Sequence, residues 1–319
     1  MKTIIDQPIE EKYLADDIKD KLGEISCSKP EYYVNGNLRL LQESDLRLPT
    51  RVVQNVNKGS FGHVAVVMGE KPGAGIIAAS AAFAFGAGLV TLVCKGRPVC
   101  CPYELMDSPA PPAATNALAL GMGLGVPSDA PAPGSAAAGV PAASSPTARV
   151  LAWLEEHPDV PCVFDADILK YKGIKGLIQG REKVVLTPHP KEFATLLFLC
   201  GLGEYSVPYI AEHRFELVRR FCAAFPQAVL LLKGANSLIA QGVKVCVNTL
   251  GSPCLAKGGS GDVLAGLVAA LMAQGYSAYD AAVSGSLAHA LASRRVRCSY
   301  GMTPFELIEK VKELEYSPN

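Results

Sequence analysis

The hydrophobic positions of this chain fall into two kinds of segment, short continuous apolar runs and longer runs with helical spacing. The apolar runs show little polar alternation, which is typical of strands covered by helices on both faces. Such runs are His63–Met68, Leu89–Cys94, Ala117–Leu120, Pro161–Phe164, Lys183–Leu186 and Ala228–Leu232. Helical spacing is found at Ile76–Phe85, Ala148–Glu156, Ala211–Phe225, Val263–Met272 and Asp280–Arg295. This alternation predicts an α/β fold with a mostly parallel sheet.

Two stretches fall outside the alternation of strands and helices. Residues 1–50 are polar and weakly patterned, and they are predicted to form an extension. Residues 126–148 are rich in Pro, Ala, Gly and Ser, a composition that cannot supply a hydrophobic core. They are predicted to be a long surface loop or insertion. The rest of the chain is expected to form one continuous α/β domain, whose strand order the pattern does not fix.

A glycine-rich turn stands directly before one of the predicted helices. The residues Gly258–Gly261 read Gly-Gly-Ser-Gly, and Asp262 follows them. The first N–H groups of a helix lack partners within it and lie at the positive end of its dipole, so this turn favours an anion such as phosphate. An aspartate there would repel the anion, which favours a second task for Asp262 as a general base toward a hydroxyl. The alternative is a helix cap, which does not require three neighbouring glycines.

Other short motifs share one property, since each directly follows an apolar strand. They are Gly69–Gly75, Gly121–Gly125, Asp165-Ala-Asp167, Thr187–Glu192 and Lys233–Ser237. The carboxyl ends of parallel strands meet at one edge of a sheet, so these motifs together predict a single ligand-binding rim. The chain has neither a GxxxxGK[ST] nor a GxGxxG pattern, which excludes an ordinary P-loop enzyme and a plain Rossmann dehydrogenase.

Several polar residues in these motifs have a structural interpretation beside the functional one. His189 lies between two prolines that fix its direction, but a lone histidine is about as often structural. Asp165 and Asp167 are candidates to anchor a hydrated Mg²⁺ or to cap the next helix, and the cap is favoured for one of them. Lys233 is placed to touch a nucleotide phosphate or to be solvated at a strand end.

Composition and charge narrow the class of protein. Of the 319 residues 49% are apolar, which is enough for a large core, and the formal net charge is zero. Nothing in this balance predicts a nucleic acid or an anionic membrane as a partner. The ten cysteines form no CxxC pair, so a zinc site is not expected, and reduced thiols favour the cytoplasm. The first residues lack the apolar core of a signal peptide, and the uncharged stretch Gly73–Cys94 divides into a helix and a strand rather than a membrane span.

Taken in order along the chain, the motifs resemble those of the NAD(P)H-hydrate dehydratases, which belong to the ribokinase-like superfamily. The resemblance covers about residues 45–310. The motifs that carry it are Lys58–Gly62, Pro72–Ala74, Gly121–Gly125, Asp165–Asp167, Leu186–Pro190, Leu232–Ala235 and Leu255–Gly266. It implies a three-layer sandwich, in which a mostly parallel central sheet carries helices on both faces.

The resemblance also implies a reaction in nicotinamide nucleotide repair. NADH hydrate and NADPH hydrate would be restored to NADH and NADPH by phosphorylation of the ring hydroxyl and loss of phosphate, with ADP or ATP as donor and Mg²⁺ as cofactor. Bacterial members usually take ADP. The resemblance assigns roles to the following residues: Asp262 as the base; Gly258, Gly259, Ser260 and Gly261 around the phosphate; Lys233, Gly234, Ala235, Asn236, Ser237 and Gly261 on the nucleotide; Ala74, Gly123, His189 and Asp262 on the hydrated dinucleotide.

Many bacterial members carry an upstream epimerase domain. The resemblance therefore implies that residues 1–45 are the remnant of such a domain and that residues 46–319 are the dehydratase domain. It also suggests a homo-oligomer, of which a tetramer is one form. Two alternatives remain at this point: a small-molecule kinase of the same superfamily that acts on a vitamin precursor alcohol, and a non-enzymatic nucleotide-sensing protein on the same fold.

Overall fold

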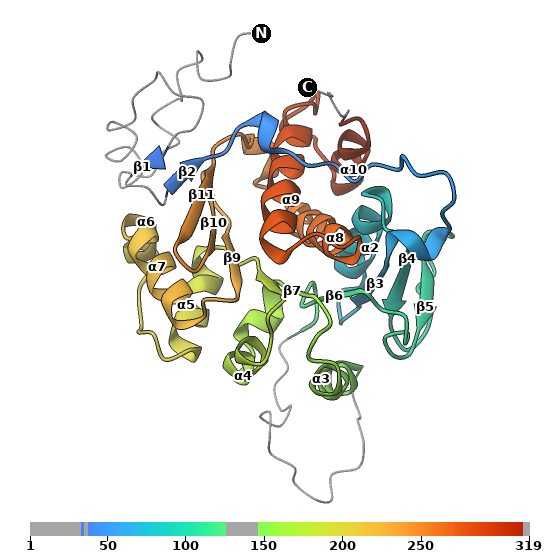
Figure 1. The fold of residues 1–319 in the computed structure, drawn as a ribbon, viewed down its shortest axis with the longest axis horizontal. Helices are drawn as coiled ribbons and strands as arrows, with labels where there is room; N and C mark the ends of the chain where they lie inside the picture. Colours follow the sequence, from blue (N-terminus) through green and yellow to red (C-terminus); the bar gives the residue numbers. More distant parts are fainter. Residues whose placement is uncertain (1–32, 35–37, 126–145, 315–319) are drawn as a thin grey trace, which may run out of the picture.

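A single mixed sheet forms the centre of the molecule (Figure 1). The structure is a computed structural model and describes residues 33–34, 38–125 and 146–314. Among these residues the strands lie in the order β1-β2-β11-β10-β9-β8-β7-β6-β3-β4-β5, and the seven from β9 to β5 run parallel. Their bounds are β1 Tyr33–Val34, β2 Leu38–Leu40, β3 His63–Val67, β4 Leu89–Val93, β5 Met106–Ser108, β6 Ala117–Leu120, β7 Cys162–Phe164, β8 Val184–Leu186, β9 Val229–Leu232, β10 Ser237–Gln241 and β11 Lys244–Asn248.

Helices cover both faces of this sheet, as predicted. One hydrophobic cluster joins the sheet to α2 Pro72–Ala84, α8 Ser260–Ala273, α9 Ala278–Ser293 and α10 Pro304–Lys312. A second cluster on the opposite face joins it to α3 Pro146–Glu156, α4 Ile174–Gln179, α5 Pro190–Leu199, α6 Val207–Glu212 and α7 Arg214–Ala224. Short 3₁₀ turns complete the described elements at η3 Glu43–Asp45, η4 Lys58–Phe61, η5 Ala166–Lys170 and η6 Pro253–Leu255.

Strand β3 shows why the central strands read as continuous apolar runs. Its residues Val64 and Val66 belong to one cluster, whereas Ala65 and Val67 belong to the other, and all four are fully buried. Alternate side chains of a strand point to opposite faces, so a strand covered on both sides has no position that faces solvent. The predicted α/β sandwich with a mostly parallel sheet is confirmed.

The predicted element limits need three corrections. Helix α2 begins at Pro72, so the second half of the expected loop Gly69–Gly75 is helical; proline is well suited to a first turn because the N–H it lacks has no helical partner there. The helical run Ala211–Phe225 is divided at His213 between α6 and α7. The antiparallel pair β10 and β11 was not predicted from the sequence.

The N-terminal part of the chain contributes to the sheet. Strand β2 pairs in parallel with β11, and the N–H group of Leu41 donates to the carbonyl oxygen of Val247 at 2.8 Å. These residues come from the segment that the resemblance assigns to an extension, so its last part completes one edge of the sheet. The proline- and alanine-rich segment lies outside the described residues up to position 145. Within the described part of the chain, no helix is both long and apolar enough to cross a bilayer.

Close packing of α2 against α8 requires a glycine at position 266. A methyl group placed on Gly266 would lie 2.1 Å from the carbonyl oxygen of Ala78. Gly73 in α2 is its matched control, because the same methyl group would meet nothing within 4 Å. We expect Gly266→Ala to lower the free energy of unfolding by at least about 2 kcal/mol, because one helix must shift. Gly73→Ala should be neutral or stabilising by about 0.5 kcal/mol, because alanine favours the helix. Urea denaturation measures both changes, and equal stability of the two variants would contradict this account of the packing.

Candidate active site

The loops that follow five strands converge at the carboxyl edge of the sheet. Strands β3, β6, β7, β8 and β9 are parallel neighbours, so the residues after them lie along one rim. The chain runs outward from β3 to β4 and β5, and then returns to β6 on the other side of β3. This reversal is a topological switch point, where the loops separate and open α/β sheets bind their ligands. The predicted rim is therefore present.

The glycine-rich turn forms the N-terminus of α8 at this rim. Gly259 is the N-cap residue with a φ of 90°, and a methyl group there would lie 2.4 Å from Cγ of Pro304. Glycine is therefore needed both for the left-handed backbone and for the close approach. A methyl group on Gly258 would meet nothing within 4 Å, so this residue faces open space.

Two hydrogen bonds to other parts of the chain fix Ser260, the first residue of α8. The Ser260 hydroxyl donates to the carbonyl oxygen of Leu255 at 2.6 Å, and Nε2 of His289 lies 2.9 Å from the carbonyl oxygen of Ser260. Burial lowers the pKa of His289 to about 4, so the ring is neutral at pH 7 and donates its one N–H here. His289 was missed from the sequence because it sits among apolar residues of a helix and contacts the turn 29 positions away.

Asp262 lies in the first turn of α8 and is not its cap, since that position belongs to Gly259. Burial raises the pKa of Asp262 to about 7, the negative charge of Asp165 adds to the increase, and Lys233 opposes it. A carboxyl group with a pKa near 7 is suited to accept a proton at neutral pH. The geometry thus favours the general base over the helix cap.

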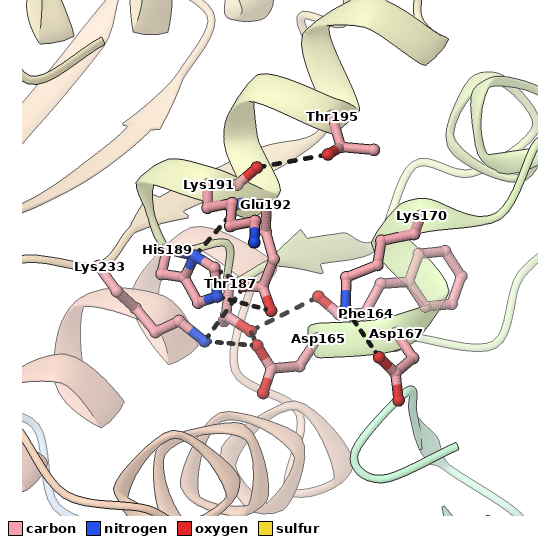
Figure 2. Close-up of polar contacts among 10 residues, drawn as sticks. All are labelled: Phe164, Asp165, Asp167, Lys170, Thr187, His189, Lys191, Glu192, Thr195 and Lys233. Carbon is pink, nitrogen blue, oxygen red and sulfur yellow. Dashed lines mark hydrogen bonds and ion pairs between the residues drawn. The ribbon is translucent and has the colours of Figure 1, made fainter. Parts of the chain in front are cut away.

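A buried ion pair crosses the rim from β9 to β7. Nζ of Lys233 lies 2.7 Å from Oδ1 of Asp165 and 3.8 Å from Oε2 of Glu192, as Figure 2 shows. The buried Thr187 hydroxyl donates to the same Oδ1 at 2.7 Å. Burial lowers the pKa of Lys233, but the charges of Asp165, Glu192 and Asp262 outweigh it and raise the pKa above its ordinary value. Lys233 is therefore held as a cation by Asp165, although 20% of its side chain is still exposed.

The cap expected for Asp165 or Asp167 is also absent. Asp165 stands at the N-cap of η5, but its side chain accepts no capping hydrogen bond and contacts Lys233 instead. Asp167 lies inside η5, where it accepts from the N–H group of Gly125 at 3.1 Å and pairs with Lys170 at 2.8 Å. Both carboxylates thus hold other parts of the rim.

His189 has the structural role that its alternative interpretation predicts. It is the N-cap of α5, and its Nδ1 accepts from the N–H group of Glu192 at 3.2 Å. Nε2 lies 3.2 Å from Oε1 of the same Glu192, and the side chain is 47% exposed. The ring is thus fixed at both nitrogens, while nearly half of its surface is open at the rim.

Ala74 and Gly123 meet at the switch point between β3 and β6. Gly123 has a φ of 59°, and a methyl group on it would lie 2.9 Å from Cβ of Ala74. The carbonyl oxygen of Gly123 accepts from the N–H group of Lys71 at 2.9 Å. Two residues assigned to the dinucleotide are therefore side by side, although 49 positions separate them in the sequence.

The loop from Lys233 to Ser237 is held by a residue that sequence reasoning missed. The buried Arg214 guanidinium donates to the carbonyl oxygen of Asn236, and it would lie 3.3 Å from a methyl group on Gly234. Gly234 and Ala235 are exposed, Ser237 is half-buried, and the Asn236 side chain is buried in the loop. The exposed glycine and alanine place backbone rather than bulky side chains at the rim.

The expected link to Mg²⁺ rests on one carboxylate, that of Asp165. Among residues 33–34, 38–125 and 146–314, no three His, Cys, Asp or Glu side chains form a group that could hold a metal. Oδ1 of Asp165 contacts Lys233 and Thr187. Oδ2 is near the glycine-rich turn, since it would lie 3.8 Å from a methyl group placed on Gly261. Mg²⁺ usually keeps several waters and binds one or two carboxylates together with substrate phosphates, and Asp165 fits that mode.

Comparison with known proteins decides the family. The sequence profile described as NAD(P)H-hydrate dehydratase matches residues 64–313. The chain belongs to the NAD(P)H-hydrate dehydratase family. The ADP-dependent (S)-NAD(P)H-hydrate dehydratase of Neisseria meningitidis serogroup B is 34% identical over 294 residues, which cover 86% of this chain and 91% of that protein.

A longer relative of the same family matches more strongly. The bifunctional NAD(P)H-hydrate repair enzyme Nnr of Helicobacter pylori is 40% identical over 310 residues, which cover 94% of this chain and 61% of that protein. The chain thus spans about three fifths of this relative.

Solved structures of distant family and superfamily members share the fold. A ribokinase-like superfamily protein of Enterococcus faecalis has a TM-score of 0.70 at 20% identity, covering 88% of this chain and 96% of its own. The ADP/ATP-dependent NAD(P)H-hydrate dehydratase of Bacillus subtilis, co-crystallised with ATP and Mg²⁺, has a TM-score of 0.63 at 22% identity, covering 83% and 92%. The predicted ribokinase-like sandwich is confirmed.

The raised pKa of Asp262 makes a prediction about stability. The folded protein binds this proton more tightly than the unfolded chain. The stability that this binding contributes is therefore fully present below the ordinary pKa of 3.8 and is lost as pH rises toward 7. Asp262→Asn removes the charge, so it should be more stable than the wild type by about 2–4 kcal/mol above pH 7, and the gain should shrink toward pH 4. Thermal denaturation from pH 4 to pH 8 measures this. The control is Asp280→Asn, because Asp280 is exposed and also lies in the first turn of a helix. A gain for Asp262→Asn that is the same at every pH would contradict the raised pKa.

Proposed function

We propose that this chain restores NADH and NADPH from their hydrates with ADP or ATP as phosphoryl donor. Family membership supports the reaction class, and one observation carries the chemistry. Asp262, in the first turn of α8 directly after the glycine-rich turn, has a pKa of about 7 and interacts with the charge of Lys233. Hydroxide is a poor leaving group and phosphate is a good one, so phosphorylation of the ring hydroxyl makes the elimination feasible.

The proposed mechanism has two steps. In the first, Asp262 takes the proton of the ring hydroxyl, whose oxygen attacks the terminal phosphorus of the nucleotide, and the bond from that phosphorus to the nucleotide breaks. In the second, the ring carbon–oxygen bond breaks and phosphate leaves with its electron pair. The neighbouring ring carbon then loses a proton to solvent water, which restores the double bond. The positive end of α8 and the Lys233 ammonium stabilise the charge on the migrating phosphoryl group.

The roles proposed for the remaining residues are those that the family resemblance implies, and their places at the rim support them. The turn Gly258–Gly261, including Ser260, would hold the migrating phosphate, and Gly261 together with Lys233–Ser237 would contact the nucleotide. Ala74, Gly123, His189 and Asp262 would face the hydrated dinucleotide, with the first two at the switch point. Asp165 would hold a hydrated Mg²⁺, which neutralises phosphate charge when bound.

The cellular setting belongs to the same proposal. We place the reaction in the cytoplasm and the chain in a homo-oligomer, with a tetramer as one form. We also propose that residues 1–45 are the remnant of an epimerase domain and that residues 46–319 are the dehydratase domain. The bifunctional relatives, of which this chain spans only part, support that division.

The products distinguish this function from a small-molecule kinase on the same fold. Incubation with NADH hydrate and either ADP or ATP should return the absorbance of reduced nicotinamide and release free phosphate. Asp262→Asn should lower turnover by about 10²–10⁴-fold, because the general base is lost, while ADP binding measured by calorimetry remains. Asp280→Asn should leave both unchanged. An accumulating phosphorylated alcohol would support the kinase, and undiminished turnover of Asp262→Asn would reject its role as base.

The pKa of Asp262 also predicts the pH dependence of turnover. The base must be ionised, so kcat/KM for NADH hydrate should fall about tenfold for each pH unit below about 7 and level off above it. Initial rates in buffers of constant ionic strength from pH 5 to pH 9 measure the profile. A rate that stays constant between pH 5 and pH 7 would contradict this assignment.

A further inference from the structure

Glu192 makes contacts to both halves of the candidate site, although the reaction proposed above gives it no task. Its carboxylate is 6% exposed and lies in the first turn of α5. Oε2 accepts from the N–H group of His189 at 2.9 Å and lies 3.8 Å from Nζ of Lys233, while Oε1 lies 3.2 Å from Nε2 of His189. Figure 2 shows the side chains of Glu192, His189 and Lys233 close together. One carboxylate therefore touches a residue assigned to the dinucleotide and a residue assigned to the nucleotide.

Helix capping alone does not account for this arrangement. Ser, Thr, Asp and Asn are the favoured N-cap residues, and α6, α9 and α10 use Ser206, Ser277 and Thr303 for the same bond. Helix α5 uses His189 instead, and its partner acid is buried beside a cation rather than exposed as Asp280 is in α9. A local choice that capping does not favour, made at a candidate site, points to a functional constraint.

The hydrogen bonds at His189 define its proton arrangement. Nδ1 accepts from the N–H group of Glu192, so the neutral ring carries its proton on Nε2, which faces Oε1 of Glu192. The orientation and the tautomer of the ring thus depend on one residue. At the same time the carboxylate shares the ammonium group of Lys233 with Asp165. A phosphate that binds Lys233 would therefore weaken the attraction between Lys233 and Glu192. The same carboxylate orients His189, so its contact with the ring would change as well.

We propose that Glu192 is a positioning residue that couples the two substrates, by orienting His189 toward the hydrated dinucleotide and restraining Lys233 toward the nucleotide phosphates. The proposal rests on the function proposed above. It assigns Glu192 no contact with the reacting atoms. Its effect is exerted on the affinity for both substrates rather than on the proton transfer by Asp262.

The variant Glu192→Gln tests the coupling without removing the helix cap, because glutamine also serves at this position of a capping box. The amide loses the charge near Lys233 and places a donor against the Nε2–H group of His189. We expect KM for NADH hydrate to rise about tenfold, the scale of a lost hydrogen bond to a charged group. KM for ADP should rise about threefold, the scale of a weak ion pair, because Glu192 meets Lys233 at 3.8 Å, and kcat should change less than about twofold. Asp280→Asn, the matched acid in the first turn of α9, should change neither KM.

Double-mutant cycles separate coupling from a loss of structure. His189→Asn keeps a favoured N-cap, and Lys233→Met removes the charge while keeping an unbranched side chain. The effects of Glu192→Gln and His189→Asn on KM for NADH hydrate should overlap rather than multiply, as should those of Glu192→Gln and Lys233→Met on KM for ADP. Nitrogen-15 spectra of the histidine ring provide a readout that needs no turnover: His189 should be the Nε2–H tautomer in the wild type and a mixture in Glu192→Gln.

The outcomes distinguish this inference from the proposed function. A wild type that does not restore NADH rejects the function, whereas the ring spectra and ADP calorimetry still test the contacts of Glu192. If the wild type is active, the coupling is wrong should Glu192→Gln raise only one KM, should the paired effects multiply, or should the tautomer stay unchanged. A lowered melting temperature with both KM values unchanged would reduce Glu192 to a helix cap.

Discussion

The ion pair between Lys233 and Asp165 is the interaction on which the candidate site depends. The Asp165 side chain is 2% exposed, and the lysine reaches it from two strands away. Three carboxylates, those of Asp165, Glu192 and Asp262, act on this one cation. Buried charges of one sign are unfavourable unless they are paired, and removal of one partner from a buried pair costs about 3–5 kcal/mol. The positive charge of Lys233 therefore offsets the repulsion among the three carboxylates and allows them to lie together at the rim.

The same charge arrangement explains how an aspartate can stand in an anion site. The pKa of Asp262 is raised to about 7, since burial and Asp165 disfavour its charge while Lys233 favours it. An incoming phosphate thus meets a cation and the positive end of α8 rather than a full set of negative charges. Backbone geometry supplies the space, because Gly259 has a left-handed conformation and Gly121 lies against the backbone at Asp165.

The sequence predicted the central fold well because burial on both faces leaves a plain signal. Strands such as β3 and β9 read as continuous apolar runs, and the rim motifs follow them directly. The strand pair β10 and β11 was missed although its signal is local, because only Gly242 and Val243 separate the two strands and a glycine with positive φ at the start of such a loop is typical of a hairpin. Segments outside the described residues, such as 126–145, leave their predictions untested.

At the site, the residues that stand in glycine-rich or strand-end motifs could be predicted, whereas their supports could not. Arg214 and His289 contact the rim through partners 22 and 29 positions away, so no local spacing reveals them. Thr187 stands in a predicted motif, but its hydrogen bond to Asp165, 22 positions away, could not be predicted. The charge state of Asp262 was beyond prediction for the same reason, because it depends on burial and on residues from two other strands. A motif thus indicates which groups are candidates to meet a ligand, but their protonation and orientation are set by long-range contacts. Glu192 belongs to this second class: its motif was visible, while its position between His189 and Lys233 required the folded chain.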